Sequence, residues 1–461
     1  MMKYISTRGG GQPLNFTEAV LAGLARDGGL YLPETLPDFS ASNEAFSKLS
    51  YKELAFEIMR PFADTITEEE LRGIVEKSYS TFRDSEVTPV RQVGPVSILE
   101  LFHGPTLAFK DVALQFLGNL FECILAKTGG EMNIVAATSG DTGSAAINGV
   151  RGRKGIRIFV MHPAGRVSPV QEMQMTTVTD DNVFNLAVKG TFDDCQNIVK
   201  ELFGDLQFRD ANKLGAVNSI NWARLLAQVV YYFYAAYRVI ERTGAKSVDF
   251  SVPTGNFGDI FAGYIARRLG APVRRLVLAT NENDILSRYL DTGTYSVGEV
   301  VPTLSPSMDI QVASNFERYL YYLSGCNPEK VSSWMRQFRE TGSLTPDAAA
   351  EECFVSGRGD TADTLRTIAQ FHREYGYLLD PHTAVGVAAA LRRIDEGVPM
   401  VCLSTAHPAK FPDAIIRATG EDIARHPLVD ALAGKPVRKF EMPADRKAVG
   451  DFVSEKCNAP R

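Results

Sequence analysis

The chain has few of the residues that build disulfide frameworks and metal sites. It has six cysteines and six histidines among 461 residues, with no CxxC, no HExxH and no paired histidine spacing. A disulfide framework and a structural zinc site are therefore not expected, and we predict no metal. We expect reduced thiols at Cys123, Cys195, Cys326, Cys353, Cys402 and Cys457.

Long apolar runs and an excess of positive charge are also absent. No run of about 18 apolar residues occurs, and the first residues lack the apolar core of a signal peptide. The formal net charge of −6 argues against a nucleic-acid partner, which calls for a basic face. We therefore expect a cytoplasmic monomer or small homo-oligomer that binds neither a membrane nor a nucleic acid.

The chain does contain an ordinary globular composition, 45% hydrophobic, arranged as strands that alternate with helices. Apolar strands followed by turns and helices predict βαβ crossovers and a parallel sheet, hence an α/β fold. A helix is expected over 111–126. Predicted strands span 96–102, 134–137, 156–161, 248–252, 276–279 and 400–403.

The length predicts two or three domains. Residues 1–92 look mainly helical and are assigned to an N-terminal domain. A large domain is assigned to 93–128 and 214–461, and a small domain to 129–213. Within the large domain, residues 413–461 have weaker periodicity and are expected to wrap the outside.

One lysine has an unusual setting. Lys110 follows a Gly-Pro turn in His103-Gly104-Pro105-Thr106-Leu107-Ala108-Phe109-Lys110 and precedes a strongly apolar helix pattern. Partial burial would disfavour its ammonium form and free a nucleophilic amine that can condense with an aldehyde. A lysine whose stem packs while its head reaches water is the alternative, and this segment alone leaves both open.

Three further segments fall where open α/β sheets bind ligands, after the carboxyl ends of strands. The loop 254–259 joins a strand to a helix with two glycines, which suits a single phosphate. The loop 139–144 offers hydroxyls and amides to a carboxylate, and Thr405 follows a buried strand. Taken singly, these are explained by a tight turn, a helix N-cap and a β-branched strand end. Together they describe a site for an aldehyde cofactor that carries a phosphate and a ring nitrogen.

These segments resemble the threonine synthase family of fold-type II pyridoxal-phosphate enzymes, related in fold to the tryptophan synthase β subunit. The N-terminal domain and the length look like the longer branch found in many bacteria and fungi. The resemblance covers almost the whole chain, and its motifs are Asp27–Pro33, His103–Asp111, Ala137–Ala145, Val252–Asp259, Ala279–Leu286 and Leu403–Phe411.

Carried over by position, the resemblance implies pyridoxal 5'-phosphate as cofactor, with Lys110 forming the Schiff base and acting as catalytic base. Thr405 would bond the pyridine nitrogen, which suits elimination and replacement better than transamination. Amides of the phosphate loop would hold the cofactor phosphate, namely Gly255, Asn256, Phe257, Gly258 and Asp259. Three residues would hold the substrate carboxylate: Ser139, Gly140 and Thr142.

Two parts of the site depart from the pattern or lack a motif. Many fold-type II relatives carry Asn where Asp141 stands, to bond the ring hydroxyl, and an aspartate cannot donate there unless protonated. The groups that bind the substrate phosphate are not fixed by a motif, and Arg224 is equally explained as a surface charge on a helix. The candidates are Arg166, Ser168, Asn221 and Arg224.

The resemblance implies a reaction that converts O-phospho-L-homoserine and water to L-threonine and phosphate, by γ-elimination and β-hydration. This is the last step of threonine biosynthesis. Alternatives are a serine or threonine dehydratase of the same fold type and a phospholyase that yields an oxo acid and ammonia. A non-enzymatic alternative is a cofactor-free binding protein on the same fold.

Overall fold

The computed structural model describes residues 1–458, and the chain divides into two compact units. The first comprises residues 1–109 and 219–424, and the second comprises residues 110–218 with those from 425 onward. The predicted division places 110–128 and the C-terminal segment in a large domain, whereas the structure groups both stretches with the second unit. The three-part division itself stays a prediction.

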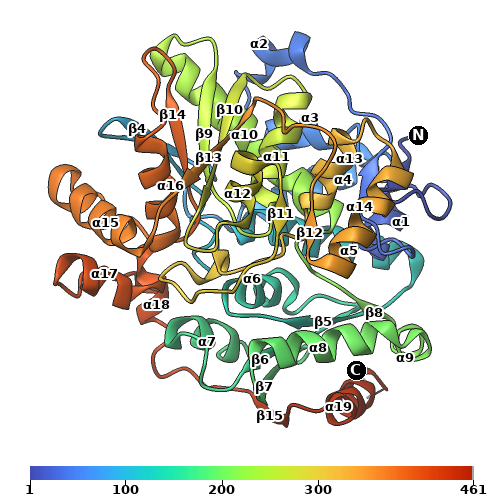
Figure 1. Ribbon diagram of the computed structural model, residues 1–461. Coiled ribbons are helices and arrows are strands. Elements are labelled where there is room, and N and C mark those ends of the chain that lie inside the picture. The colour runs from blue at the N-terminus through green and yellow to red at the C-terminus, as the bar shows by residue number, and fades with distance from the viewer. Residues whose placement is uncertain (459–461) are drawn as a thin grey trace. The chain divides into compact units, whose positions relative to one another are not determined.

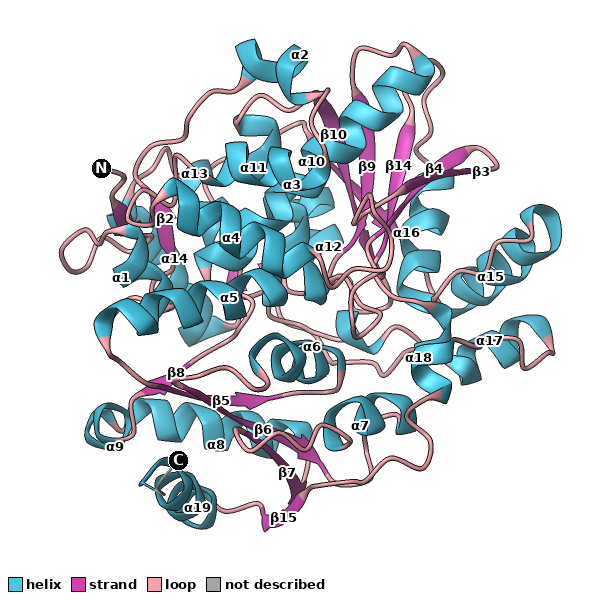
Figure 2. Ribbon diagram, turned by 180° about the vertical axis from the view of Figure 1, so that it is seen from behind, coloured by secondary structure: helices cyan, strands magenta, loops and turns pink. Residues whose placement is uncertain are grey.

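The first unit is built on a six-stranded sheet in the order β13-β10-β9-β14-β4-β3. All neighbouring pairs are parallel except β3 and β4, which form an antiparallel pair at one edge. Figures 1 and 2 show α15 and α16 on one side of this sheet and α10 and α11 on the other. Its strands are β3 (Val90–Val93), β4 (Val96–Glu100), β9 (Val248–Pro253), β10 (Val273–Thr280), β13 (Phe354–Arg358) and β14 (Met400–Ser404).

Helices and two small ribbons complete the first unit. The antiparallel ribbons pair β1 (Tyr4–Ser6) with β2 (Tyr31–Pro33) and β11 (Tyr295–Ser296) with β12 (Ser343–Leu344). The helices are α1 (Phe16–Ala22), α2 (Asn43–Phe46), α3 (Tyr51–Met59), α4 (Glu68–Tyr79), α10 (Trp222–Thr243), α11 (Gly258–Arg268), α12 (Ile285–Thr292), α13 (Phe316–Leu323), α14 (Pro328–Thr341), α15 (Thr361–Tyr375), α16 (Pro381–Leu391) and α17 (Pro412–Thr419).

Local signals in the sequence explain where these helices begin and end. Ser50 and Glu53 form a capping box at the start of α3, as Thr67 and Glu70 do for α4, so the first amides of each helix have acceptors. Gly244 ends α10 in the left-handed conformation, which costs glycine no steric strain.

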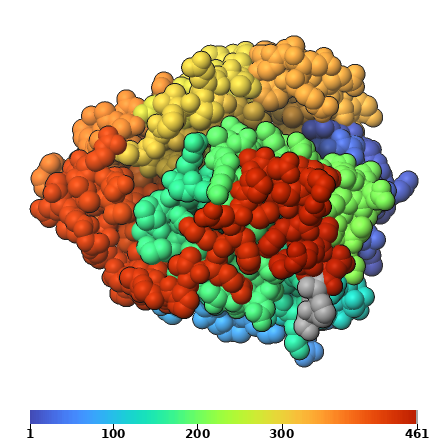
Figure 3. All heavy atoms as spheres, turned by 90° about the horizontal axis from the view of Figure 1, so that it is seen from below, coloured from blue at the N-terminus to red at the C-terminus, as the bar shows by residue number. Residues whose placement is uncertain are grey.

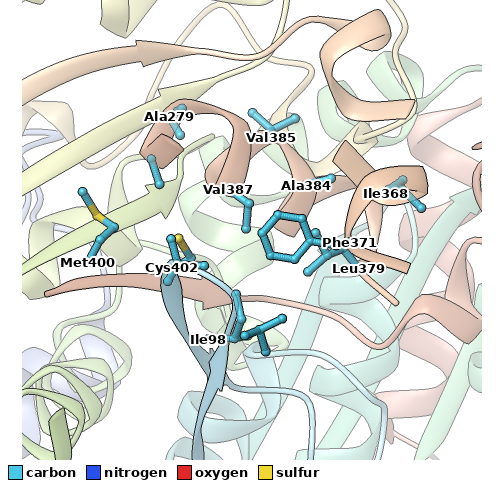
Figure 4. Close-up of a cluster of buried hydrophobic side chains, with 14 of the residues drawn as sticks. Ile98, Ala279, Ile368, Phe371, Leu379, Ala384, Val385, Val387, Met400 and Cys402 are labelled. Atoms are coloured by element: carbon cyan, nitrogen blue, oxygen red, sulfur yellow. The ribbon is translucent and has the colours of Figure 1, made fainter. Parts of the chain in front are cut away.

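The apolar core between α16 and the sheet fixes the strands whose ends carry the site (Figure 4). Ile98, Met400 and Cys402 contribute from strands, and Ala384 and Val387 contribute from α16, all at most 2% exposed. Because such interiors are close-packed, the ends of β4 and β14 are held rigidly.

The second unit contains a five-stranded parallel sheet in the order β15-β7-β6-β5-β8. Figure 2 shows α6 on one side of this sheet and α8 on the other. Its elements are α5 (Lys110–Thr128), β5 (Met132–Ala137), α6 (Asp141–Val150), β6 (Ile156–Pro163), α7 (Pro169–Thr176), β7 (Val183–Lys189), α8 (Phe192–Gly204), α9 (Leu206–Ala211), β8 (Leu214–Gly215), α18 (Pro427–Asp430), β15 (Phe440–Pro443) and α19 (Arg446–Asn458).

Residues 413–461 were expected to wrap the outside, but residues 440–458 also contribute to the sheet and core of the second unit, and 459–461 lie outside the described residues. β15 adds a parallel strand beside β7, and Val449 and Val453 of α19 are fully buried against Ile198 and Leu202 of α8. Figure 3 shows this segment in dark red against green residues of the same unit. β15 was hard to predict from the sequence because only alternate residues of this strand are shielded from solvent, and those only partly.

Candidate active site

The sheet order of the first unit brings three predicted site segments to neighbouring strand ends. β4 leads into the lysine segment, β14 into Thr405 and β9 into the loop 254–259, and these strands are adjacent in the order β9-β14-β4. They are mutually parallel, so their carboxyl ends lie at the same edge of the sheet. The Phe109 amide donates to the Thr405 carbonyl at 2.8 Å, and Lys110 is the next residue of the chain.

The turn before the lysine is fixed by groups that sequence reasoning did not assign. Leu107 adopts a left-handed backbone, with φ of 63°, and its carbonyl accepts from the His407 amide at 3.0 Å. The fully buried ammonium of Lys410 donates to the Thr106 carbonyl at 2.7 Å. The two segments are about 300 residues apart, so only the folded chain reveals this contact.

Lys110 is the first residue of α5 and is 9% exposed, so the structure favours the buried lysine over one whose head reaches water. Within its unit, its Nζ lies 3.7 Å from Oδ2 of Asp141, which is also buried. The other carboxylate oxygen of Asp141 accepts from Nε2 of Gln171 at 2.8 Å. Asp141 is therefore oriented toward the lysine by a neighbouring amide.

The loop 254–259 turns directly from β9 into α11. Phe257 takes a left-handed backbone, with φ of 62°, and its buried ring packs edge-on against Phe316 at a centroid distance of 5.4 Å. A Cβ at Gly255 would lie 2.6 Å from the Ser307 carbonyl oxygen, so only glycine fits. The first amides of α11 have no partners within the helix, as an anion cup requires, whereas the Phe257 amide donates to the Gly255 carbonyl at 2.8 Å.

The side chain of Asp259 is turned away from that cup. Its carboxylate accepts from the Tyr231 hydroxyl and, at 2.9 Å, from the Tyr232 hydroxyl, both on α10. Burial raises the pKa of Asp259 to about 6, although both tyrosine bonds act in the opposite direction. The side chain of Asp259 is therefore occupied, and the binding of an anion by its backbone amide stays a prediction.

Thr405 is 6% exposed and its backbone is held by a network around Asp380. The Thr405 amide donates to Oγ1 of Thr383 at 3.2 Å, and the Thr383 hydroxyl donates to the Asp380 carboxylate. Oγ1 of Thr383 also lies 3.1 Å from the Ser404 hydroxyl. Sequence reasoning missed this support, although Asp-Pro before an apolar run is a helix N-cap signal.

The loop 139–144 follows β5 in the second unit. Oγ1 of Thr138 accepts from the amides of Gly140 and Gly143, each at 2.9 Å. Gly140 has φ of 139°, and a Cβ there would lie 2.4 Å from Gln171. Ser139 is exposed and Thr142 half-buried, so both hydroxyls are accessible to a ligand.

The four candidates for the substrate phosphate have different surroundings. Arg166 is exposed, whereas Ser168 caps α7 and donates to Oε1 of Gln171 at 3.0 Å. Asn221 is fully buried, with its amide oxygen capping α10 and its Nδ2 donating to the Val20 carbonyl at 2.8 Å. Arg224 is 4% exposed, and burial lowers its pKa to about 10, so it is charged at neutral pH.

Family models match three successive parts of the chain. Residues 3–79 match "Threonine synthase N terminus", residues 88–351 match "Pyridoxal-phosphate dependent enzyme" and residues 383–453 match "Threonine synthase, C-terminal". A threonine synthase of Pseudomonas aeruginosa is 50% identical, over 99% of this chain and 99% of that protein. One of Saccharomyces cerevisiae is 45% identical, over 98% of each.

Solved structures agree with these sequence matches. A PLP-bound threonine synthase from Brucella melitensis is similar with a TM-score of 0.94 and 46% identity over 100% of both chains. A yeast threonine synthase has a TM-score of 0.94 and 44% identity over 98% of both chains. The matches confirm the predicted fold-type II class and the predicted cofactor.

Proposed function

The chain belongs to the threonine synthase family of pyridoxal-phosphate-dependent lyases, and we propose that it converts O-phospho-L-homoserine and water to L-threonine and phosphate. The observation that carries the proposal is the meeting of three ligand segments at neighbouring strand ends, β9, β14 and β4. Similarity in fold alone would leave the reaction open.

The residues present fit the cofactor. A buried lysine is available for the covalent bond to its aldehyde. The unpaired amides at the start of α11 suit its phosphate, and the turn that leads to them has room only for glycine at position 255. Thr405 supplies a hydroxyl for the ring nitrogen on a backbone that Thr383 fixes. When bound, pyridoxal phosphate supplies the electron sink for the carbanions of the reaction.

Lys110 is the residue we assign to proton transfer. Its amine accepts the proton from Cα of the substrate, and general-base work of this kind contributes roughly 10²–10⁴-fold to rate. The carboxylate of Asp141, whose Oδ2 lies 3.7 Å from Nζ, forms an ion pair with the ammonium form and so favours it by charge once the proton has been taken. In this role an aspartate needs no proton of its own.

The substrate is held by its two anionic ends. Ser139 and Thr142 offer hydroxyls to the carboxylate at the start of α6, and Gly140, whose own amide donates to Oγ1 of Thr138, shapes the loop with its positive φ. Among the phosphate candidates, burial favours Arg224, since a buried charge lacks water to compete with the ligand. Asn221 is favoured least because both atoms of its amide already serve the chain.

Three rivals are separated by one set of assays. The holoenzyme is incubated with O-phospho-L-homoserine and, separately, with threonine, and the products are quantified. We expect threonine and phosphate from the first and no 2-oxobutyrate from the second. Phosphate with an oxo acid but no threonine would indicate the phospholyase, and 2-oxobutyrate from threonine alone the dehydratase. No visible absorbance from bound cofactor would favour the cofactor-free binding protein.

Compartment and assembly stay predictions of this proposal. No helix among residues 1–458 is long and apolar enough to cross a membrane. We propose a cytoplasmic enzyme whose partner is its small-molecule substrate, acting as a monomer or small homo-oligomer. Fractionation and light scattering would test both statements.

A further inference from the structure

A fully buried arginine lies behind the phosphate loop of the first unit. Arg318, in the first turn of α13, is 0% exposed. Its Nε and Nη2 donate to the Tyr31 carbonyl at 3.1 and 2.9 Å, and Nη2 also donates to the Ile220 carbonyl at 2.5 Å. Within residues 1–458, every hydrogen-bond acceptor of this guanidinium is neutral.

Asn315 connects this arginine to the loop. Nη1 of Arg318 donates to Oδ1 of Asn315 at 2.5 Å. The Asn315 backbone amide and its Nδ2 both donate to the Asn256 carbonyl, at 3.1 and 3.2 Å. Asn315 is itself fully buried, so these bonds are shielded from competing water.

Two effects make the position of the Arg318 charge unfavourable. A cation in the first turn of a helix opposes the positive end of the helix dipole. A buried charge also loses its hydration, and here the acceptors that replace the water are neutral, while the nearby carboxylate of Glu317 is already paired with Arg8. Burial lowers the pKa of Arg318 to about 9, which still leaves the guanidinium charged at neutral pH. An anion bound to the loop would offset both penalties.

We propose that Arg318 is a positioning residue for the phosphate loop, fixing Asn256 through Asn315 and favouring a bound phosphate by its buried charge. The inference rests on the proposed function, which assigns the amides of 255–259 to the cofactor phosphate. It adds a second layer to that site, in which neither Arg318 nor Asn315 needs to touch the ligand.

The test compares two probes that differ only in the phosphate. Apoenzyme is titrated with pyridoxal 5'-phosphate and with pyridoxal, and binding is followed by the visible absorbance of the Lys110 adduct. Arg318→Met should weaken binding of pyridoxal 5'-phosphate by roughly tenfold, because a buried positive charge still attracts the phosphate at an effective dielectric constant of about 20. Pyridoxal binding should change by less than about twofold, because that probe has no phosphate.

Two variants separate the charge from the hydrogen bonds. Arg318→Lys keeps the charge and should recover part of the lost affinity. Asn315→Ala keeps the charge but removes the side-chain bonds to Asn256, to the Ser219 carbonyl and to Arg318. The bond to Asn256 is the one that touches the loop, and its loss should weaken phosphate-dependent binding by about fivefold. Asn315→Ala also gives the answer if Arg318→Met does not fold.

Arg8→Met is the matched control. Arg8 pairs with Glu317, the neighbour of Arg318, at 2.8 Å, and among residues 1–458 none of its side-chain hydrogen bonds reaches the loop 254–259. It should leave the ratio of the two affinities unchanged. Equal losses for both probes in Arg318→Met, or an equal change in Arg8→Met, would overturn the inference. Failure of the wild-type protein to bind either probe would instead overturn the proposed function.

Discussion

The loops 139–144 and 254–259 are built alike, yet each treats its aspartate differently. Both join a parallel strand to a helix, both contain two glycines, and both place an aspartate in the first turn. Asp141 lies 3.7 Å from the Lys110 ammonium, whereas Asp259 accepts from the hydroxyls of Tyr231 and Tyr232. The same helix signal therefore places one carboxylate beside the amine of Lys110 and turns the other toward two tyrosine hydroxyls.

The two loops also differ in which residues hold them in place. The loop 139–144 is held by its own Thr138 and by Gln171 of the next helix. The loop 254–259 is held by residues from distant parts of the chain, namely Ser307, Asn315 and Phe316. A locally supported loop suits a substrate that comes and goes, and a loop fixed by distant segments suits a cofactor that stays.

The largest effect is expected from Lys110→Ala, which removes the amine that pairs with Asp141. Turnover should fall by at least roughly 10²–10⁴-fold, since general-base catalysis is lost. The visible absorbance of the cofactor adduct should disappear as well. Lys127→Ala, at the exposed far end of the same helix, should retain both. A variant at position 110 that keeps the absorbance band would remove the lysine from its assigned role.

A large stability effect is expected from Asp259→Asn. Because burial raises the pKa of Asp259 to about 6, the folded protein holds this proton more tightly than the unfolded chain. Its contribution is therefore greatest below pH 4 and is lost as the pH rises through about 6. The shift corresponds to about 3 kcal/mol, which Asn should recover at pH 8 while retaining the tyrosine bonds.

Urea unfolding at pH 4.5 and pH 8 measures this effect. The wild-type protein should lose more stability between the two values than Asp259→Asn does. Glu374→Gln, an exposed carboxylate elsewhere in the first unit, serves as the control for changes in net charge. Identical pH dependence in the wild type and Asp259→Asn would contradict the assignment.

A smaller effect on cofactor binding is expected from Gly255→Ala. The added methyl would meet a backbone carbonyl at 2.6 Å, and overpacking of this kind costs about 1–3 kcal/mol. Affinity for pyridoxal 5'-phosphate should fall roughly tenfold to a hundredfold in absorbance titrations.

Gly140→Ala gives the matched comparison, because it places the same methyl in the other loop. It should raise KM for O-phospho-L-homoserine and leave cofactor affinity near the wild-type value. The distinction between cofactor loop and substrate loop would collapse if the two variants lost cofactor affinity equally.

The parts predicted from the sequence are those with local signals. Strands 156–161, 248–252 and 400–403 are confirmed because they are buried on both faces and read as apolar runs. β13 and β15 were not predicted, since both are edge strands with half-exposed residues.

The site residues divide in the same way, into those with a local sequence signal and those without one. Glycines and a lysine after a strand are visible in the sequence, and Lys110 is buried. The roles of Thr383, Lys410 and Arg318 depend on contacts between residues distant in the chain. A polar residue inside an apolar run gives no sign of which carbonyl it will reach.

The smallest effect is expected from Thr138→Val, which tests how far the substrate loop supports itself. Valine keeps the shape of threonine but removes the acceptor for the Gly140 and Gly143 amides. Each of the two lost hydrogen bonds costs about 1 kcal/mol, but both also form without substrate, so only part of the loss affects binding. KM for O-phospho-L-homoserine should rise by about fivefold while cofactor affinity stays the same. Thr138→Ser restores the hydroxyl and should restore KM. A loss of cofactor affinity in Thr138→Val, reversed by serine, would instead show that this loop supports the cofactor too.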